Sequence, residues 1–182
     1  HLRIFICGGA PVPFHLLEMG AKQMPSTALI QGYGLTETSP ILSFLHLPQA
    51  NVVGDAKVLG SVGKPLAGVE MRLLNVENGA GELAVRGPNV FSEYLDRLAD
   101  TKAAFEEGWF RTGDVARFDE HGFLHILDRL KDVIITGGEN VYSVEVETVL
   151  LGHPDIADVA VIGIPDEKWG ERVTAIIVPM LN

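Results

Sequence analysis

Apolar positions divide the first third of the chain into two short runs with an amphipathic stretch between them. Residues 2–7 form an apolar run, as in a strand buried on both faces. Residues 13–24 predict a helix that turns Leu16, Leu17 and Met19 towards a core. Residues 28–30 predict a second buried strand. This alternation of strand, loop and helix predicts a parallel α/β layer.

The pattern changes near residue 60, where short strands alternate with turn signals. Residues 70–74, 81–86 and 122–127 are strand-like, and they are separated by turn sequences at 77–79 and 119–122. Short strands at this spacing indicate a small antiparallel sheet or barrel.

A third region begins near Lys131. Strands are expected at 133–135, 156–164 and 173–178, and Ser143 is placed to N-cap a helix with one apolar face, formed by Val146, Val149 and Leu150. We therefore expect an α/β (α+β) fold in three parts. They are the end of a large α/β domain at 1–60, a small β subdomain at 61–130, and part of a C-terminal lid domain at 131–182.

Composition narrows the function classes. The chain has 182 residues, 47% of them hydrophobic, and a formal net charge of -10. It lacks the basic stripe typical of a nucleic-acid binder, so a bound nucleotide would depend on backbone dipoles, a few cations and a metal ion. Cys7 is the only cysteine, which excludes an internal disulfide. No apolar run reaches the length of a transmembrane helix, and we expect a cytoplasmic location.

The segment after the second strand carries the strongest chemical signal. Gly32 and Gly34 let the backbone approach a ligand closely, and Tyr33 offers a flat face to a base. Thr36 offers a hydroxyl to a phosphate, and Glu37 offers a carboxylate to a metal. Spacing alone, however, favours an ordinary glycine-rich turn with an N-capping threonine.

Four further segments allow both a ligand-binding and a purely structural interpretation. Residues 8–11 end the first strand and could form one wall of an adenine pocket or a plain turn. Asp114 could accept hydrogen bonds from both ribose hydroxyls or cap its own turn. Arg129 could hold a phosphate or ribose oxygen, or belong to a solvated salt-bridge cluster. Gly137 and Gly138 could approach a narrow ligand or form a turn.

Taken together, the order and spacing of these motifs resemble the adenylate-forming superfamily. This superfamily contains acyl- and aryl-CoA synthetases, firefly luciferase and the adenylation domains of nonribosomal peptide synthetases. The resemblance covers essentially the whole chain. It rests on Gly-Gly-Ala-Pro at 8–11, Tyr-Gly-Leu-Thr-Glu at 33–37, Gly-Glu-Leu at 81–83, Thr-Gly-Asp at 112–114, Asp-Arg-Leu-Lys-Asp at 128–132 and Gly-Gly-Glu-Asn-Val at 137–141.

The resemblance implies a nucleotide site. Thr36 would bind a phosphate, Glu37 would bind Mg²⁺, and Asp114 would bind the ribose with help from Arg129. The residues implied to line the nucleotide are Gly9, Ala10, Pro11, Gly32, Tyr33, Gly34 and, from beneath, Ile126.

The resemblance also implies a reaction. ATP would activate a carboxylic acid, fatty or aromatic, as its adenylate, and coenzyme A would then take the acyl group. Lys131 would be the hinge of the lid, and Gly137 and Gly138 would line the pantetheine channel. The chain starts and stops on strands, so we expect it to be an internal fragment. A phosphate loop would precede residue 1 and a catalytic lysine would follow residue 182, leaving the fragment inactive alone.

Several functions compete with this one. Residues 137–142 are similar to those of fatty-acyl and aryl-CoA ligases, which argues against amino-acid adenylation for a carrier protein. The motifs leave open a luciferase-like oxygenase, a non-catalytic module that binds nucleotide or a partner protein, and a plain structural α/β domain. Relatives often carry Pro where this chain has Ser143, a difference expected to change only the entry to the helix.

Overall fold

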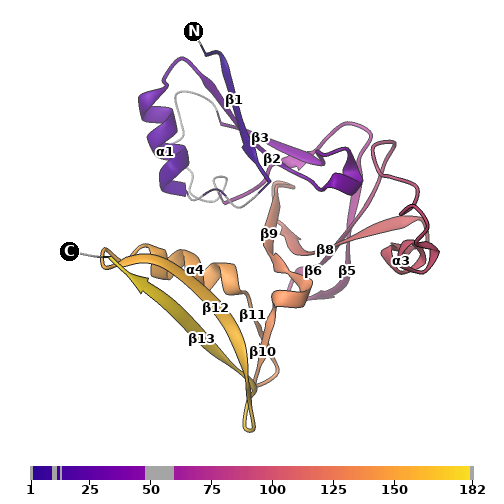
Figure 1. Ribbon diagram of the computed structural model, residues 1–182. Helices are drawn as coiled ribbons and strands as arrows, with labels where there is room; N and C mark the ends of the chain where they lie inside the picture. Colours follow the sequence, from indigo (N-terminus) through magenta and orange to yellow (C-terminus); the bar gives the residue numbers. More distant parts are fainter. Residues whose placement is uncertain (1, 10–11, 13, 48–59, 181–182) are drawn as a thin grey trace. The chain divides into compact units, whose positions relative to one another are not determined.

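A computed structural model describes residues 2–9, 12, 14–47 and 60–180. Three β-sheets with a few short helices confirm the predicted mixed α/β class (Figure 1). The chain divides into two compact units, His1–Thr112 with Ala116–Ile126, and Gly113–Val115 with Leu127–Asn182. The three-part division at residues 60 and 130 stays a prediction. Within the described ranges, no helix combines the length and apolarity needed to span a membrane.

The first sheet has four strands in the order β1-β2-β3-β4. Strands β1 and β2 are parallel, whereas the β2–β3 and β3–β4 pairs are antiparallel. Helix α1 connects the two parallel strands. The bounds are β1 Ile4–Gly8, α1 Phe14–Gln23, β2 Ala28–Tyr33, β3 Ser43–Leu47 and β4 Lys64–Pro65.

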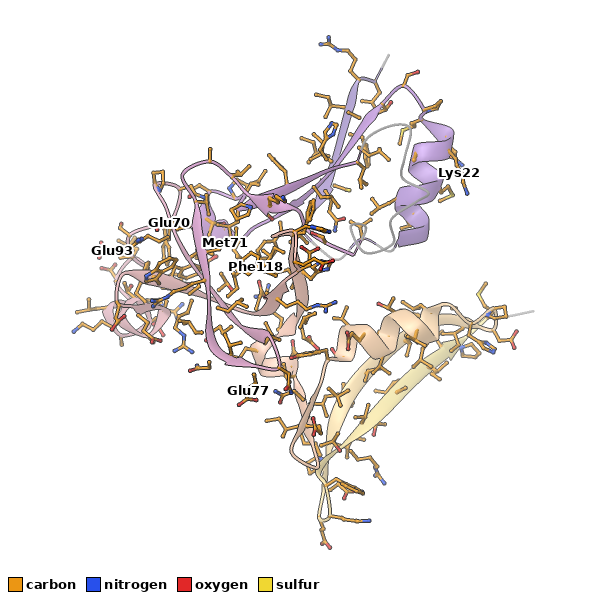
Figure 2. The ribbon with its side chains drawn as sticks, turned by 180° about the vertical axis from the view of Figure 1, so that it is seen from behind. Lys22, Glu70, Met71, Glu77, Glu93 and Phe118 are labelled. Carbon is orange, nitrogen blue, oxygen red and sulfur yellow. The ribbon has the colours of Figure 1, made fainter. Side chains whose placement is uncertain are left out.

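One face of α1 packs on this sheet. Leu17 is buried and contacts a core with Leu29 and two leucines of β3, while Ala21 and Met24 pack against the same core. Figure 2 shows Lys22 on the side of α1 that faces away from the strands. Among the residues predicted to face the core, Leu17 does so, but Leu16 and Met19 are exposed, because a short helix presents a single stripe to one sheet.

Strand β1 contradicts one prediction. The apolar run at 2–7 predicts a strand buried on both faces, yet the side chains of Ile4, Phe5 and Ile6 are 55%, 45% and 55% exposed. The reason is its position: β1 is the end strand of its sheet, and among the residues that the structure describes it pairs only with β2. Of its side chains, only Cys7 packs against the core shared with α1.

The second sheet has the order β5-β6-β8-β7, with β9 also paired to β8. The β5–β6 and β7–β8 pairs are antiparallel, and the sheet is open within the described residues, so it forms a sheet rather than a barrel. The predicted strands at 70–74, 81–86 and 122–127 are confirmed with shifted ends. The bounds are β5 Glu70–Glu77, β6 Ala80–Arg86, α3 Leu98–Ala104, β7 Phe105–Glu106, β8 Trp109–Phe118 and β9 Leu124–Arg129.

A second core covers one face of this sheet. Its fully or nearly fully buried members are Leu42, Leu83, Val85, Phe110, Ala116 and Leu124. Met71 and Phe118, both labelled in Figure 2, pack against it, as do Tyr33 and Ile126. This core therefore joins the end of β2 to the five-stranded sheet.

The second unit contains a sheet in the order β11-β10-β13-β12 and helix α4. Helix α4 lies along the long β12–β13 ribbon (Figure 1), where Val146 and Leu150 pack against Ile134 and Val161. Val149, predicted for the same face, is instead 77% exposed. The bounds are β10 Ile134–Thr136, β11 Glu139–Val141, α4 Ser143–Leu151, β12 Ile156–Asp166 and β13 Gly170–Pro179.

The start of α4 differs from the predicted cap. Tyr142 is the N-cap residue and makes no side-chain cap bond, while Ser143 is already helical. The Ser143 hydroxyl cannot cap because it donates to Asp128 Oδ2 at 2.8 Å. The same carboxylate oxygen accepts the Ser143 backbone N–H, so Asp128 takes the place of an N-cap side chain.

Candidate functional site

The parallel pair β1–β2 brings two predicted site segments to one edge. Gly8 lies opposite Gly32 in the register, so the carboxyl ends of both strands meet there. Gly9 follows β1 with φ +85°, a conformation that favours glycine. Ala10 and Pro11, predicted for the adenine pocket, lie outside the described residues. This edge is where ligands bind in open α/β sheets.

Gly32 and Gly34, predicted to let a ligand approach the backbone closely, each have another part of the protein close to them. Strand β2 extends through Tyr33 because β3 pairs with it that far. A Cβ on Gly32 would lie 3.1 Å from Cε1 of Phe44, and one on Gly34 would lie 1.9 Å from the Pro40 carbonyl oxygen. The fold therefore requires Gly34 and leaves little space for a side chain at Gly32, and the contact of both with a nucleotide stays a prediction.

Thr36 and Glu37 lie on a 3₁₀ turn, η1, at Thr36–Thr38. The Leu35 N–H donates to Thr38 Oγ1 at 2.9 Å, and the Thr38 hydroxyl donates back to the Leu35 carbonyl at 2.9 Å. Thr38 is buried, whereas Thr36 is exposed and Glu37 is half-buried. The third residue of the turn thus fixes its shape and leaves the two predicted ligand-binding side chains accessible.

A distant segment, residues 87–97, contacts this turn, and sequence analysis missed it. The Tyr94 hydroxyl donates to Glu37 Oε1 at 2.8 Å, and the Phe91 N–H donates to the Glu37 carbonyl at 2.8 Å. The Asn89 side-chain amide donates to the carbonyls of Thr38 and Ile41. Since Tyr94 is 57 residues from Glu37, local spacing holds no signal for this contact.

Asp114 and Arg129, predicted to act together at the ribose, form an ion pair in the second unit. Arg129 Nε lies 2.9 Å from Asp114 Oδ1, and the Asp114 side chain is only 4% exposed. A buried carboxylate needs such a partner, because an unpaired buried charge is costly. The pair is one of the few predicted combinations that the structure brings into direct contact.

The position of Asp114 differs from the predicted tight turn. It lies within the ten-residue strand β8, next to Gly113, which has φ +72°. A glycine in this conformation inside a strand redirects the following side chain without ending the strand. Thr112 is held on the other side by a hydrogen bond from its hydroxyl to the Leu83 carbonyl at 2.8 Å.

The remaining predicted residues occupy separate places in their units. Lys131 is exposed on a short 3₁₀ turn, η2, at Leu130–Asp132. Gly137 and Gly138 form the turn between β10 and β11, with φ +61° and +88°. The Gly137 N–H donates to the Trp169 carbonyl at 2.8 Å. Ile126, in the first unit, packs on the same core as Tyr33.

Glu37 is the candidate metal ligand, and its surroundings fit Mg²⁺. In the part of the chain that the structure describes, no cluster of three or more His, Cys, Asp or Glu side chains forms a metal site. Tyr94 occupies Oε1, while Oε2 has no hydrogen bond within the described residues. A single carboxylate with phosphates and water completing the shell is a usual arrangement for Mg²⁺, so Glu37 suits a metal that arrives with ATP.

Comparison with known proteins finds similar sequences along almost the whole chain. A long-chain-fatty-acid–CoA ligase of Mycobacterium tuberculosis is 43% identical over 184 residues, which cover 99% of this chain and 35% of the ligase. A feruloyl-CoA synthase of an Amycolatopsis species is 44% identical over 184 residues, covering 98% of this chain and 36% of the synthase. The chain thus spans about a third of the length of these relatives.

A similar structure has also been solved. The o-succinylbenzoate CoA synthetase MenE of Bacillus subtilis, in complex with the acyl-adenylate intermediate OSB-AMP, has a TM-score of 0.86 and 39% identity, covering 99% of this chain and 37% of that one. MenE has also been solved with ATP and a magnesium ion.

Family models match both ends of the chain. The model described as AMP-binding enzyme matches residues 1–95, more than half of the chain, and the model of the AMP-binding enzyme C-terminal domain matches residues 145–182. The chain therefore belongs to the AMP-binding enzyme family.

Proposed function

We propose that this chain is part of an AMP-forming acid–thiol ligase, which activates a carboxylic acid with ATP and transfers the acyl group to coenzyme A. A fatty or aromatic acid is the proposed substrate. The observation that carries the proposal is the similarity to CoA ligases of long-chain fatty acids and ferulate over 98–99% of the chain. The Thr36–Glu37 turn at the carboxyl edge of β1 and β2 supports it, because ligands bind at that edge.

In the first proposed step, a carboxylate oxygen of the acid bonds to the α-phosphorus of ATP while the bond to pyrophosphate breaks. Both reactants are anions, so the barrier is largely electrostatic. The Thr36 hydroxyl would donate to a phosphate oxygen. Mg²⁺, when bound at Glu37, would neutralise part of the phosphate charge. Asp114 would accept hydrogen bonds from the ribose beside Arg129.

In the second proposed step, the thiol sulfur of coenzyme A bonds to the acyl carbon and AMP leaves. The chain would contribute positioning, since neither step requires a protein nucleophile. The Gly137–Gly138 turn would line the path of the pantetheine arm. A Cβ on Gly138 would meet no atom within 4 Å, which leaves room for a narrow ligand, whereas one on Gly137 would lie 3.0 Å from the Trp169 ring. Lys131 would serve as the hinge that brings this turn to the acyl group.

Substitution of Glu37 and Asp114 in the complete enzyme tests the proposal. We expect Glu37→Gln and Asp114→Asn each to reduce acid-dependent ATP–pyrophosphate exchange by about 10²–10³-fold, since each removes a charged contact to ATP or its metal. Glu93→Gln is the matched control, because Glu93 is an exposed carboxylate on a neighbouring segment (Figure 2). Exchange at the wild-type rate in both site variants would refute the site.

The 182-residue chain by itself is expected to be inactive. It spans about a third of the length of its relatives, so groups that stabilise charge in the transition state would be missing. The measurement is ATP–pyrophosphate exchange with a panel of fatty and aromatic acids. A clear acid-dependent exchange signal from the chain alone would contradict this expectation.

A further inference from the structure

Segment 87–97 holds Glu37 at both its backbone and its side chain. The Phe91 N–H donates to the Glu37 carbonyl at 2.8 Å, and the Tyr94 hydroxyl donates to Glu37 Oε1 at 2.8 Å. Asn89 holds the following carbonyls of Thr38 and Ile41 at 2.9 and 3.0 Å. The position of one carboxylate is therefore set by a segment that takes no part in the 3₁₀ turn itself.

The segment is anchored firmly enough to position a side chain. The centroid of the Phe91 ring lies 4.7 Å from that of the Tyr94 ring, 5.5 Å from that of Phe105 and 5.3 Å from that of the buried Phe110. The Tyr94 N–H donates to Thr101 Oγ1 at 2.9 Å. Aromatic contacts and a backbone bond thus hold Tyr94 from two sides, which limits the arc that its hydroxyl can reach.

We propose that Tyr94 is a positioning residue that occupies Oε1 of Glu37, leaving Oε2 alone for the metal, and thereby favours Mg²⁺ over Ca²⁺. This inference rests on the proposed function. Mg²⁺ requires near-octahedral geometry and suits a carboxylate that binds through one oxygen, whereas Ca²⁺ accepts more ligands and tolerates a carboxylate that binds through both. A hydroxyl that donates to one oxygen competes with the metal for that oxygen and so disfavours binding through both.

Tyr94→Phe in the complete enzyme removes the hydroxyl and keeps the ring. The Kd of ATP would be measured by titration calorimetry with saturating Mg²⁺ and, separately, with saturating Ca²⁺, without acid so that no reaction occurs. We expect the preference for the magnesium complex, given by the ratio of the two Kd values, to fall about tenfold, since a hydrogen bond to a charged group is worth about that factor. An unchanged ratio, or equal weakening of both complexes, would overturn the inference.

Two further variants separate positioning from folding. Leu17→Ala weakens the separate core between α1 and the first sheet and keeps the Tyr94 hydroxyl, so it should lower the unfolding temperature without changing the metal ratio. In a Glu37→Gln background, Tyr94→Phe should have no further effect on the ratio. An equal fall of the metal ratio in Leu17→Ala, or a further fall in the double variant, would contradict the positioning role.

The proposed function and this inference fail in different ways. If the wild-type enzyme shows no metal-dependent ATP binding, the proposed function falls and this inference falls with it. If the wild type binds ATP with Mg²⁺ and Tyr94→Phe keeps the wild-type ratio, the inference alone is refuted.

Discussion

Among single residues, Asp119 shows how one carboxylate can stabilise a turn. Its Oδ1 accepts the N–H groups of His121 and Phe123 at 2.9 Å each, and its Oδ2 lies 3.3 Å from His125 Nε2. Desolvation raises the pKa of Asp119, but the bonds from the Phe123 amide, His125 and the His121 amide together lower it below the ordinary value. The ionised form is therefore favoured in the folded protein.

This lowered pKa predicts a pH-dependent stability. The contribution of Asp119 should be fully present above the ordinary aspartate pKa of about 3.9 and be lost as the pH falls through its lower folded value. In urea unfolding of the complete enzyme, we expect the difference in stability between wild type and Asp119→Asn to shrink as the pH falls below about 4. Glu120→Gln is the control, and a difference that stays constant with pH would contradict the prediction.

Between elements, the Asp128 carboxylate joins the end of β9 to the first residue of α4. It accepts two bonds from Ser143 and, through Oδ1, the Arg129 N–H at 2.8 Å. Asp128 and Ser143 are both buried. These hydrogen bonds hold together the two ends of the segment between Asp128 and Ser143. That segment carries Arg129, Lys131 and the Gly137–Gly138 turn.

Variants that break the Asp128–Ser143 hydrogen bonds should lose different amounts of unfolding free energy. Ser143→Ala removes one donor and should cost about 1 kcal/mol of unfolding free energy, whereas Asp128→Ala leaves buried donors unpaired and should cost about 2–3 kcal/mol. Thermal and urea unfolding measure both. Thr148→Ala is a control on the same helix, since its hydroxyl donates only to Val144 within α4. Costs for both variants no larger than that of Thr148→Ala would show that the Asp128–Ser143 contact is unimportant.

Local patterns predicted most elements but not their ends, and the reasons are specific. Strands 70–74 and 81–86 could be predicted because Asn78 and Gly79, with φ of 49° and 82°, form the expected turn between them. The extension of β2 through Tyr33 depends on pairing with β3, and the start of α4 depends on Asp128. Those partners are distant in sequence, so no local period contains them.

The candidate site divides in the same way. Glu37, Asp114 and Arg129 are predicted from the resemblance of their motifs to the adenylate-forming superfamily, and their contacts with a ligand stay predictions. Tyr94 could not be named, since its role comes from a contact across 57 residues. Motifs in the sequence can therefore propose candidate ligand-binding residues, whereas the residues that hold them in place become visible only in the fold.

For the whole molecule, the hinge assignment at Lys131 gives a kinetic prediction. Proline fixes φ near -65° and removes an N–H, so Lys131→Pro in the complete enzyme should leave ATP–pyrophosphate exchange intact and abolish thioester formation. Lys131→Ala, which keeps the backbone free, should retain both. The two half-reactions are measured separately, and equal effects of Lys131→Pro on both would exclude the hinge.

The exposed apolar strand β1 determines how the isolated chain must be handled. Ile4, Phe5 and Ile6 lie on an end strand whose second edge has no strand partner within the described residues, and such an edge can recruit another copy by strand addition. The net charge of -10 opposes this association, less so as salt screens it. The absence of ATP–pyrophosphate exchange by the 182-residue polypeptide would thus be meaningful only for a sample that light scattering shows to be monodisperse.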